Sequence, residues 1–155
     1  MAEQQQGPLG PGDRHVAREV VMKALYERDV AQGDPLVALG FLAGEDGVGA
    51  ADQAVAERML AGVLAHLPDI DRRIAGYARD WRLSRLAAVD RNVLRLGVYE
   101  LCHDRSAPVS VCINEAVDLA NRFGSEASAG FVNGVLGQLA RDLQAEASGA
   151  HQSDG

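Results

Sequence analysis

The sequence is poor in aromatic residues, which make up only 5% of its 155 residues, although 47% of the residues are hydrophobic. A core of this composition must consist mainly of Ala, Val and Leu, and both Ala and Leu are strong helix formers. No apolar run is long enough to cross a bilayer, and the Gln-, Gly- and Pro-rich start does not resemble a signal peptide. We therefore expect a helical, cytoplasmic protein with no membrane anchor.

The sequence also lacks the common motifs of catalysis and metal binding. Cys102 and Cys112 form no CxxC pair, and the four histidines are scattered. No His-Glu-x-x-His motif occurs, and no Gly-rich loop follows a strand. Ser110 and Cys112 have no His and carboxylate nearby in sequence, and Glu115 and Asp118 are typical of solvated or salt-bridged helix acids. We expect no catalytic residue, no metal and no cofactor.

Positive charge is scarce, since 15 basic residues face 22 acidic ones and the net charge is −7. This balance argues against binding of nucleic acid through bulk positive charge. An RNA contact would need a local basic patch, helped by a partner. Charge alone favours a protein without a nucleic-acid role.

Apolar residues recur at helical spacing along most of the chain, and no segment shows sustained period-two alternation. The strongest strand candidate, residues 109–113, runs directly into a helical pattern. We predict an all-α fold of about seven helices in two packed helical bundles. The expected helices cover residues 13–31, a short stretch from Pro35, 50–67, 69–82, about 90–103, 109–122 and 128–146.

The ends of the chain are expected to be disordered tails, over residues 1–12, which are rich in Gln, Gly and Pro, and over residues 147–155, which are rich in Gly and Ser. Between them, residues 13–146 form one predicted domain, with subdomains of about 13–82 and 83–146 joined near Trp81. Pro68 should interrupt the helical pattern. Asp90 is the expected N-cap of its helix.

Several segments, in this order and spacing, resemble the NusB transcription antitermination family over most of residues 14–143. Residues 36–54 resemble nothing specific. The segments are Arg14-His15-Val16-Ala17-Arg18-Glu19, Ala24-Leu25-Tyr26, Val89-Asp90-Arg91-Asn92-Val93-Leu94-Arg95-Leu96, Tyr99-Glu100-Leu101, Ile113-Asn114-Glu115-Ala116-Val117 and Phe131-Val132-Asn133-Gly134-Val135-Leu136.

This resemblance implies a fold of two helical bundles and a role in transcription. Proteins of this family pair with the ribosomal protein NusE and bind the boxA element of nascent RNA, chiefly in ribosomal RNA leaders. The complex then keeps RNA polymerase transcribing through terminators. Whether this chain is a monomer or a homodimer stays open.

The resemblance places RNA contacts at the start of the first helix. Arg14 and Arg18 are four residues apart and share a helix face, so we expect both guanidinium groups to reach outward, where their planar donors suit phosphate. His15 lies on the adjoining polar surface and could donate to RNA or stack on a base.

Four further positions match functional sites of the family. Arg91 corresponds to a basic position near the RNA or partner surface, with a solvated helix charge as the competing explanation. Phe131 corresponds to an aromatic that stacks on RNA, and core packing competes. Tyr26 and Asp90 correspond to positions that contact NusE. The competing explanation is snorkelling at the bundle surface for Tyr26 and N-capping for Asp90. Asn114 and Glu115 are expected to tie helices together.

The sequence departs from the family pattern at positions that can contact RNA or the partner protein. Val16 stands where many members continue a run of arginines, Ala127 replaces an acidic residue, and Gly130 replaces a basic one. We therefore expect weak RNA binding by the isolated protein and stronger binding with NusE. The alternatives are a helical protein–protein adaptor without RNA binding, and a fragment from the RNA-binding domain of an RNA cytosine methyltransferase.

Overall fold

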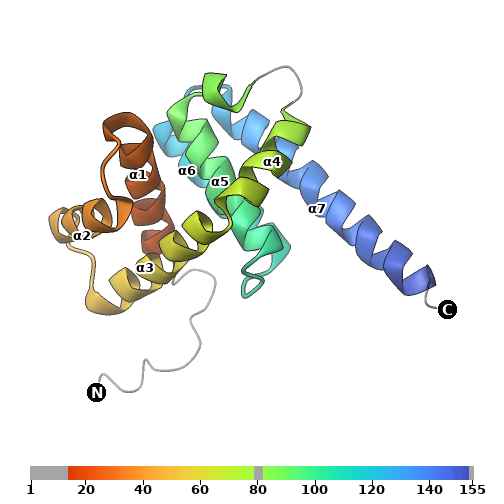
Figure 1. Cartoon of the computed structure of the whole chain (residues 1–155), viewed down its shortest axis with the longest axis horizontal. Helices are drawn as coiled ribbons and strands as arrows, with labels where there is room; N and C mark the ends of the chain where they lie inside the picture. Colours follow the sequence, from red (N-terminus) through yellow and green to blue (C-terminus); the bar gives the residue numbers. More distant parts are fainter. Residues whose placement is uncertain (1–13, 79–81, 154–155) are drawn as a thin grey trace.

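The computed structural model describes residues 14–78 and 82–153. This part of the chain consists of helices and their connections, with no strand, which confirms the predicted all-α class. Seven α-helices and one short 3-10 helix are described (Figure 1). They are α1 (His15–Ala31), α2 (Pro35–Glu45), α3 (Ala50–Ala65), α4 (Leu67–Tyr77), η3 (Leu83–Arg85), α5 (Ala88–Cys102), α6 (Val109–Phe123) and α7 (Ser128–Ser153).

Local sequence explains where several helices begin. Asp34 caps α2 by accepting a hydrogen bond from the Leu36 amide at 2.9 Å, and Pro35 follows as the first helical residue. Pro68 lies in the first turn of α4, directly after α3 has ended, so the predicted interruption is confirmed. The N-cap predicted for Asp90 is wrong, because Ala87 holds that position and Asp90 lies within the first turn of α5.

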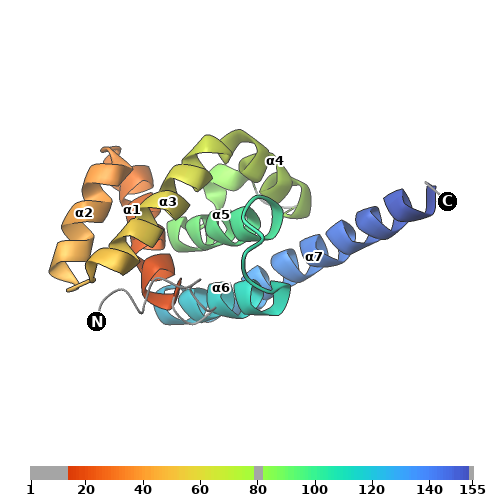
Figure 2. The same cartoon turned by 90° about the horizontal axis from the view of Figure 1, so that it is seen from below.

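Helix α5 is the centre of the molecule, since it packs against α1, α3, α4, α6 and α7. Figure 2 shows it between α4 on one side and α6 and α7 on the other. Its residues from Asn92 to Val98 are all buried. A Cβ on Gly97 would lie 2.6 Å from Leu136 Cδ1, so the missing side chain lets α5 and α7 approach closely.

Helices α4 and α7 differ in length from the prediction. The helix expected over residues 69–82 ends at Tyr77, and Trp81 lies outside the described residues. The tail expected from residue 147 is instead helical as far as Ser153, and the end of α7 extends beyond the body of the molecule (Figure 1). Alanines at 145, 147 and 150 favour this continuation.

The first tail and the division into subdomains stay predictions. The first tail, residues 1–12, falls outside the described residues. The division into subdomains at residues 82 and 83 stays a prediction. In the described part of the chain no helix combines the length and the apolar character that a membrane span requires.

Candidate nucleic-acid interface

Arg18 does not face the solvent. Its side chain is 1% exposed, and its Nε and Nη2 each donate to a different carboxylate oxygen of Glu100 at 2.8 Å. Nη1 also donates to Glu115 at 3.3 Å. The prediction that both guanidinium groups of the first helix reach outward is therefore wrong for Arg18, which joins α1 to α5 and α6 inside the bundle.

The reason lies in the position of Arg18 on its helix. Ala17, Val21 and Leu25 point into the core from the same helix, and the stripe is wide enough to take Arg18 with it. A buried charge needs a partner of opposite sign, and Glu100 supplies it from α5. Burial alone would lower the pKa of Arg18, but hydrogen bonds and charge attraction from Glu100 raise it above its usual value, so the group stays ionised.

Arg14 and His15 remain nearer the surface, but each of them contacts a carboxylate group of the protein itself. Arg14 Nη1 donates to Asp104 Oδ2 at 2.8 Å, and its side chain is 17% exposed. His15 Nδ1 lies 2.9 Å from Glu115 Oε1, with the side chain 43% exposed. We call these two basic residues with Arg18, Glu100, Asp104 and Glu115 the α1-start cluster. Its three carboxylates outnumber its two guanidinium groups.

Cys112 touches this cluster without adding a nucleophile. Its Sγ lies 3.9 Å from Glu100 Oε1. Burial and the charge of Glu100 raise the pKa of the Cys112 thiol to about 11, so it is protonated at neutral pH and unreactive. The thiol packs as a small core side chain.

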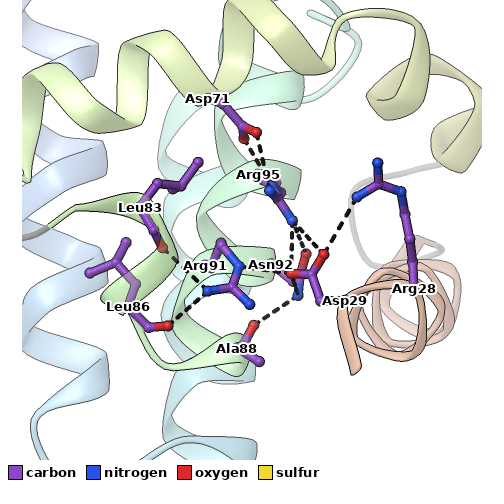
Figure 3. A network of polar contacts seen from close by, with 9 residues as sticks. All are labelled: Arg28, Asp29, Asp71, Leu83, Leu86, Ala88, Arg91, Asn92 and Arg95. Carbon is purple, nitrogen blue, oxygen red and sulfur yellow. Dashed lines mark hydrogen bonds and ion pairs between the residues drawn. The ribbon is translucent and has the colours of Figure 1, made fainter. Parts of the chain in front are cut away.

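Arg91 is also drawn into the protein, at the other end of α5. Its Nε donates to Asp29 Oδ2 at 2.7 Å, and its Nη1 donates to the carbonyls of Leu83 and Leu86 at 3.2 and 2.9 Å (Figure 3). The side chain is 14% exposed. A solvated helix charge is therefore the wrong description, and an RNA contact of Arg91 would have to compete with these bonds.

Asp29 is the acceptor at the centre of this network, which sequence reasoning missed. It also accepts hydrogen bonds from Asn92, at 3.0 Å, and from Arg95. Arg95 donates a further hydrogen bond to Asp71 (Figure 3). Burial would raise the pKa of Asp29, but Arg91 and Arg95 hold it below its usual value. The available signal was Arg95, a charged residue between the core residues Leu94 and Leu96, which required a buried partner.

Asp90 has a buried carboxylate oxygen without a partner. Its Oδ1 makes no hydrogen bond to any described residue. The residue lines a groove of about 310 Å³ together with Arg85, Leu86, Ala87, Ala127 and Phe131. We call this the Asp90 groove. An unpaired buried acceptor costs about 1–3 kcal/mol, so a bound molecule that donates to this carboxylate would remove that cost.

Phe131 packs partly against the core while lining the Asp90 groove. It also lines a second groove of about 570 Å³ with Tyr77, Gly130, Gly134 and Asp142. Core packing and an available ring face are thus both present, so the two explanations offered for this residue do not exclude each other. Asn114 is exposed, whereas Glu115 does join α6 to α1 as expected.

Tyr26 is 39% exposed on α1. It lines a groove of about 300 Å³ with Lys23, Glu27, Leu42 and Phe123, among others. The ring therefore has an exposed face at a surface where α1, α2, α5 and α6 meet. Its assignment to a partner stays a prediction, and the accessible ring is compatible with it.

The expected RNA contacts do not form one site. Arg14 and His15 belong to the end of α5 that holds Glu100, whereas Arg91 and Phe131 lie near Asp90 in its first turn. Asp90 and Glu100 are ten residues apart, which corresponds to about 15 Å along the helix axis. A ligand that contacts both ends must be extended, as a single strand of RNA is.

Comparison with known proteins agrees with the architecture. The NusB family model matches residues 15–141. The transcription antitermination protein NusB of Geobacter sulfurreducens is 40% identical over 134 residues, covering 85% of this chain and 96% of that protein. NusB of Anaeromyxobacter sp. is 46% identical over 131 residues, covering 84% of this chain and 91% of that protein.

Solved structures give the same result. NusB from T. maritima superposes with a TM-score of 0.77 at 36% identity, covering 83% of this chain and 90% of that one. A complex of the antitermination factors NusB and NusE with dsRNA gives 0.78 at 27% identity, covering 84% and 97%. These matches confirm the resemblance and the expected non-enzymatic role in transcription: the chain belongs to the NusB family of transcription antitermination proteins.

Proposed function

We propose that this chain pairs with a NusE-type ribosomal protein, and that the pair binds boxA-type single-stranded RNA of nascent ribosomal transcripts to assemble a processive RNA polymerase complex. This role belongs to the cytoplasm, where nascent RNA is made. A solved relative with 27% identity holds NusE and dsRNA, which supports NusE as the protein partner and RNA as the ligand.

The observation that carries the proposal is the unpartnered oxygen of Asp90. A buried acceptor in a groove with Arg85 and the Phe131 ring offers charge and an apolar face together. A protein that donates an N–H or O–H to Asp90 would gain a charge-assisted hydrogen bond. Asp90 and Tyr26 are the partner contacts of the proposal, while Phe131, Arg14 and His15 are its RNA contacts.

The acidic surroundings of Arg14 and His15 explain why a partner is needed. RNA that approaches the α1-start cluster meets Asp104 and Glu115 beside the basic groups, and like charge repels phosphate. A basic partner would supply the missing positive charge. Arg18 and Arg91, both engaged inside the protein, contribute to RNA binding by holding the helices in place.

The test is a titration of fluorescently labelled boxA RNA, followed by anisotropy, with this chain alone, with NusE alone and with both. We expect the mixture to bind more tightly than either protein. Asp90→Ala should weaken the effect of NusE, with Asp52→Ala as the matched control, because Asp52 is the corresponding acid in the first turn of α3.

The same titration separates the proposal from a protein–protein adaptor without RNA binding, which the carboxylates of the α1-start cluster favour. An adaptor would bind NusE or another protein and leave the RNA affinity of NusE unchanged. Equal RNA affinity with and without NusE would count against the role of the pair. Arg14→Ala tests the RNA contact directly. Because Arg14 Nη1 also lies 4.0 Å from Glu100 Oε1, the melting temperature of the variant is measured beside its RNA affinity.

A further inference from the structure

Helix α2 turns an apolar stripe toward the solvent. Its inner face is buried through Leu39 and Ala43, yet Val37 and Phe41 on the outer face are 67% and 72% exposed. Leu36 is 45% exposed beside them. Single exposed apolar residues are ordinary, but a contiguous group on one helix marks a binding surface.

Acidic residues bracket the stripe. Asp34, Val37, Phe41 and Glu45 are spaced by three, four and four residues, which places them along one face of the helix. The apolar pair Val37 and Phe41 therefore has a carboxylate before it, at Asp34, and after it, at Glu45. Asp34 also caps the helix, because its Oδ1 accepts a hydrogen bond from the Leu36 amide.

The stripe borders a groove of about 410 Å³ between α1 and α2, to which Glu27 adds a third carboxylate. The described lining contains no basic side chain. The groove shares no lining residue with the Asp90 groove, and it meets the Tyr26 groove at Glu27 and Leu42. The chemistry of this surface is thus apolar at the centre and negative at its edge.

We propose that the α2 groove binds a basic amphipathic segment of a protein partner, whose apolar side chains cover Val37 and Phe41 and whose Lys or Arg residues pair with Glu27, Asp34 and Glu45. Such segments dock their apolar face in a hydrophobic groove while their charges fix orientation. The Val37 and Phe41 stripe shares no residue with the Asp90 groove or the Tyr26 groove, and Glu27 lies at the border with the latter, so a partner segment can cover the stripe while NusE and RNA are bound.

Charge decides against the other occupants. A second copy of this chain would place the same acidic edge against itself, since a two-fold interface pairs identical patches. An anionic membrane surface would be repelled by three carboxylates. A basic segment is the occupant that relieves the repulsion among these acids and covers the apolar stripe.

The test uses a defined probe, a fluorescein-labelled amphipathic peptide of about 16 residues with Leu at helical i, i+3, i+4 and i+7 positions and Lys elsewhere. The control peptide has the same sequence with Glu in place of every Lys. Anisotropy titrations of the full chain should show saturable binding of the Lys peptide alone. Phe41→Ser and Glu45→Lys should each weaken it about tenfold, which corresponds to about 1.4 kcal/mol.

Val109→Ser is the control, because Val109 is 49% exposed at the start of α6, on another helix. Phe41 and Glu45 are both exposed, so both variants should keep the wild-type circular dichroism and melting temperature. Glu45→Lys leaves the apolar stripe intact and still tests the charge.

Three outcomes would overturn the proposal. They are absence of binding of the Lys peptide, binding of the Glu peptide with equal affinity, and wild-type binding by both groove variants. Sedimentation of the unliganded chain adds a fourth, since self-association abolished by Phe41→Ser would make a second copy the occupant. NusE and RNA binding should be unchanged in Phe41→Ser, so failure here leaves the antitermination role standing.

Discussion

Arg18 and Glu100 form a paired contact of two hydrogen bonds, each 2.8 Å long, with both side chains at most 2% exposed. The pair joins α1 to α5, while Asp29 and Arg91 join the same two helices at their other ends. The two links run in opposite order along the helices, which makes α1 and α5 antiparallel. Their role is to fix the surface that carries the functional residues.

Removal of one member of this pair should destabilise the protein strongly. Arg18→Met leaves Glu100 buried without its main donor, and the expected loss is about 3–5 kcal/mol in the free energy of unfolding. Urea denaturation measures it, with exposed Arg58→Met as a control expected to change little. The double variant Arg18→Met with Glu100→Leu should recover much of the loss. Equal stability of wild type and Arg18→Met would contradict the buried pairing.

Two glycines provide a matched test of helix packing. Gly97→Ala adds a methyl group that would meet Leu136 at 2.6 Å, and overpacking of this kind costs about 1–3 kcal/mol. At Gly134 an added Cβ meets nothing within 4 Å, so Gly134→Ala should stabilise α7 by up to about 1 kcal/mol. Thermal unfolding of both variants should therefore shift in opposite directions. Stabilisation of both variants would show that helix propensity, rather than the α5–α7 contact, dominates.

Asp104 should reduce RNA affinity by holding Arg14. Asp104→Asn keeps an oxygen that can accept from Ser106 but removes the negative charge beside the guanidinium. We expect the isolated protein to bind boxA RNA several-fold more tightly, with the gain shrinking at high salt. Asp46→Asn is the control of equal charge change, since Asp46 pairs with Lys23 elsewhere. The same gain from both variants would indicate net charge and not release of Arg14.

Asp69 should make stability depend on pH in the acid range. Hydrogen bonds from Arg73 and His103 lower the pKa of Asp69 from 3.8 to about 2. A carboxylate with a lowered folded-state pKa stabilises the fold above its unfolded pKa, and the contribution disappears as pH falls through its folded pKa. Wild type should therefore melt above Asp69→Asn near pH 6, and the gap should close between about pH 4 and pH 2. A gap that persists at pH 2 would mean that Asp69 acts through something other than its charge.

The sequence by itself determined the fold class and most helix positions. Apolar spacing located α1 to α3 and α5 to α7, and Pro35 and Pro68 marked starts and breaks, because helix periodicity and proline geometry are local properties. The segments around Asn114 and Phe131, in their order along the chain, identified the family. The absence of catalytic motifs was also readable, since those motifs are local as well.

Only the tertiary structure decided which charged residues face the solvent. Helical spacing placed Arg14 and Arg18 on one face, but Glu100, 82 residues away in the chain, determined that Arg18 points inward. Arg91 was likewise drawn in by Asp29, and Asp90 was left with an unpaired oxygen because no described residue reaches it. The physical reason is that burial of a charge depends on a partner brought near by folding, and a sequence pattern specifies the helix face but not that partner.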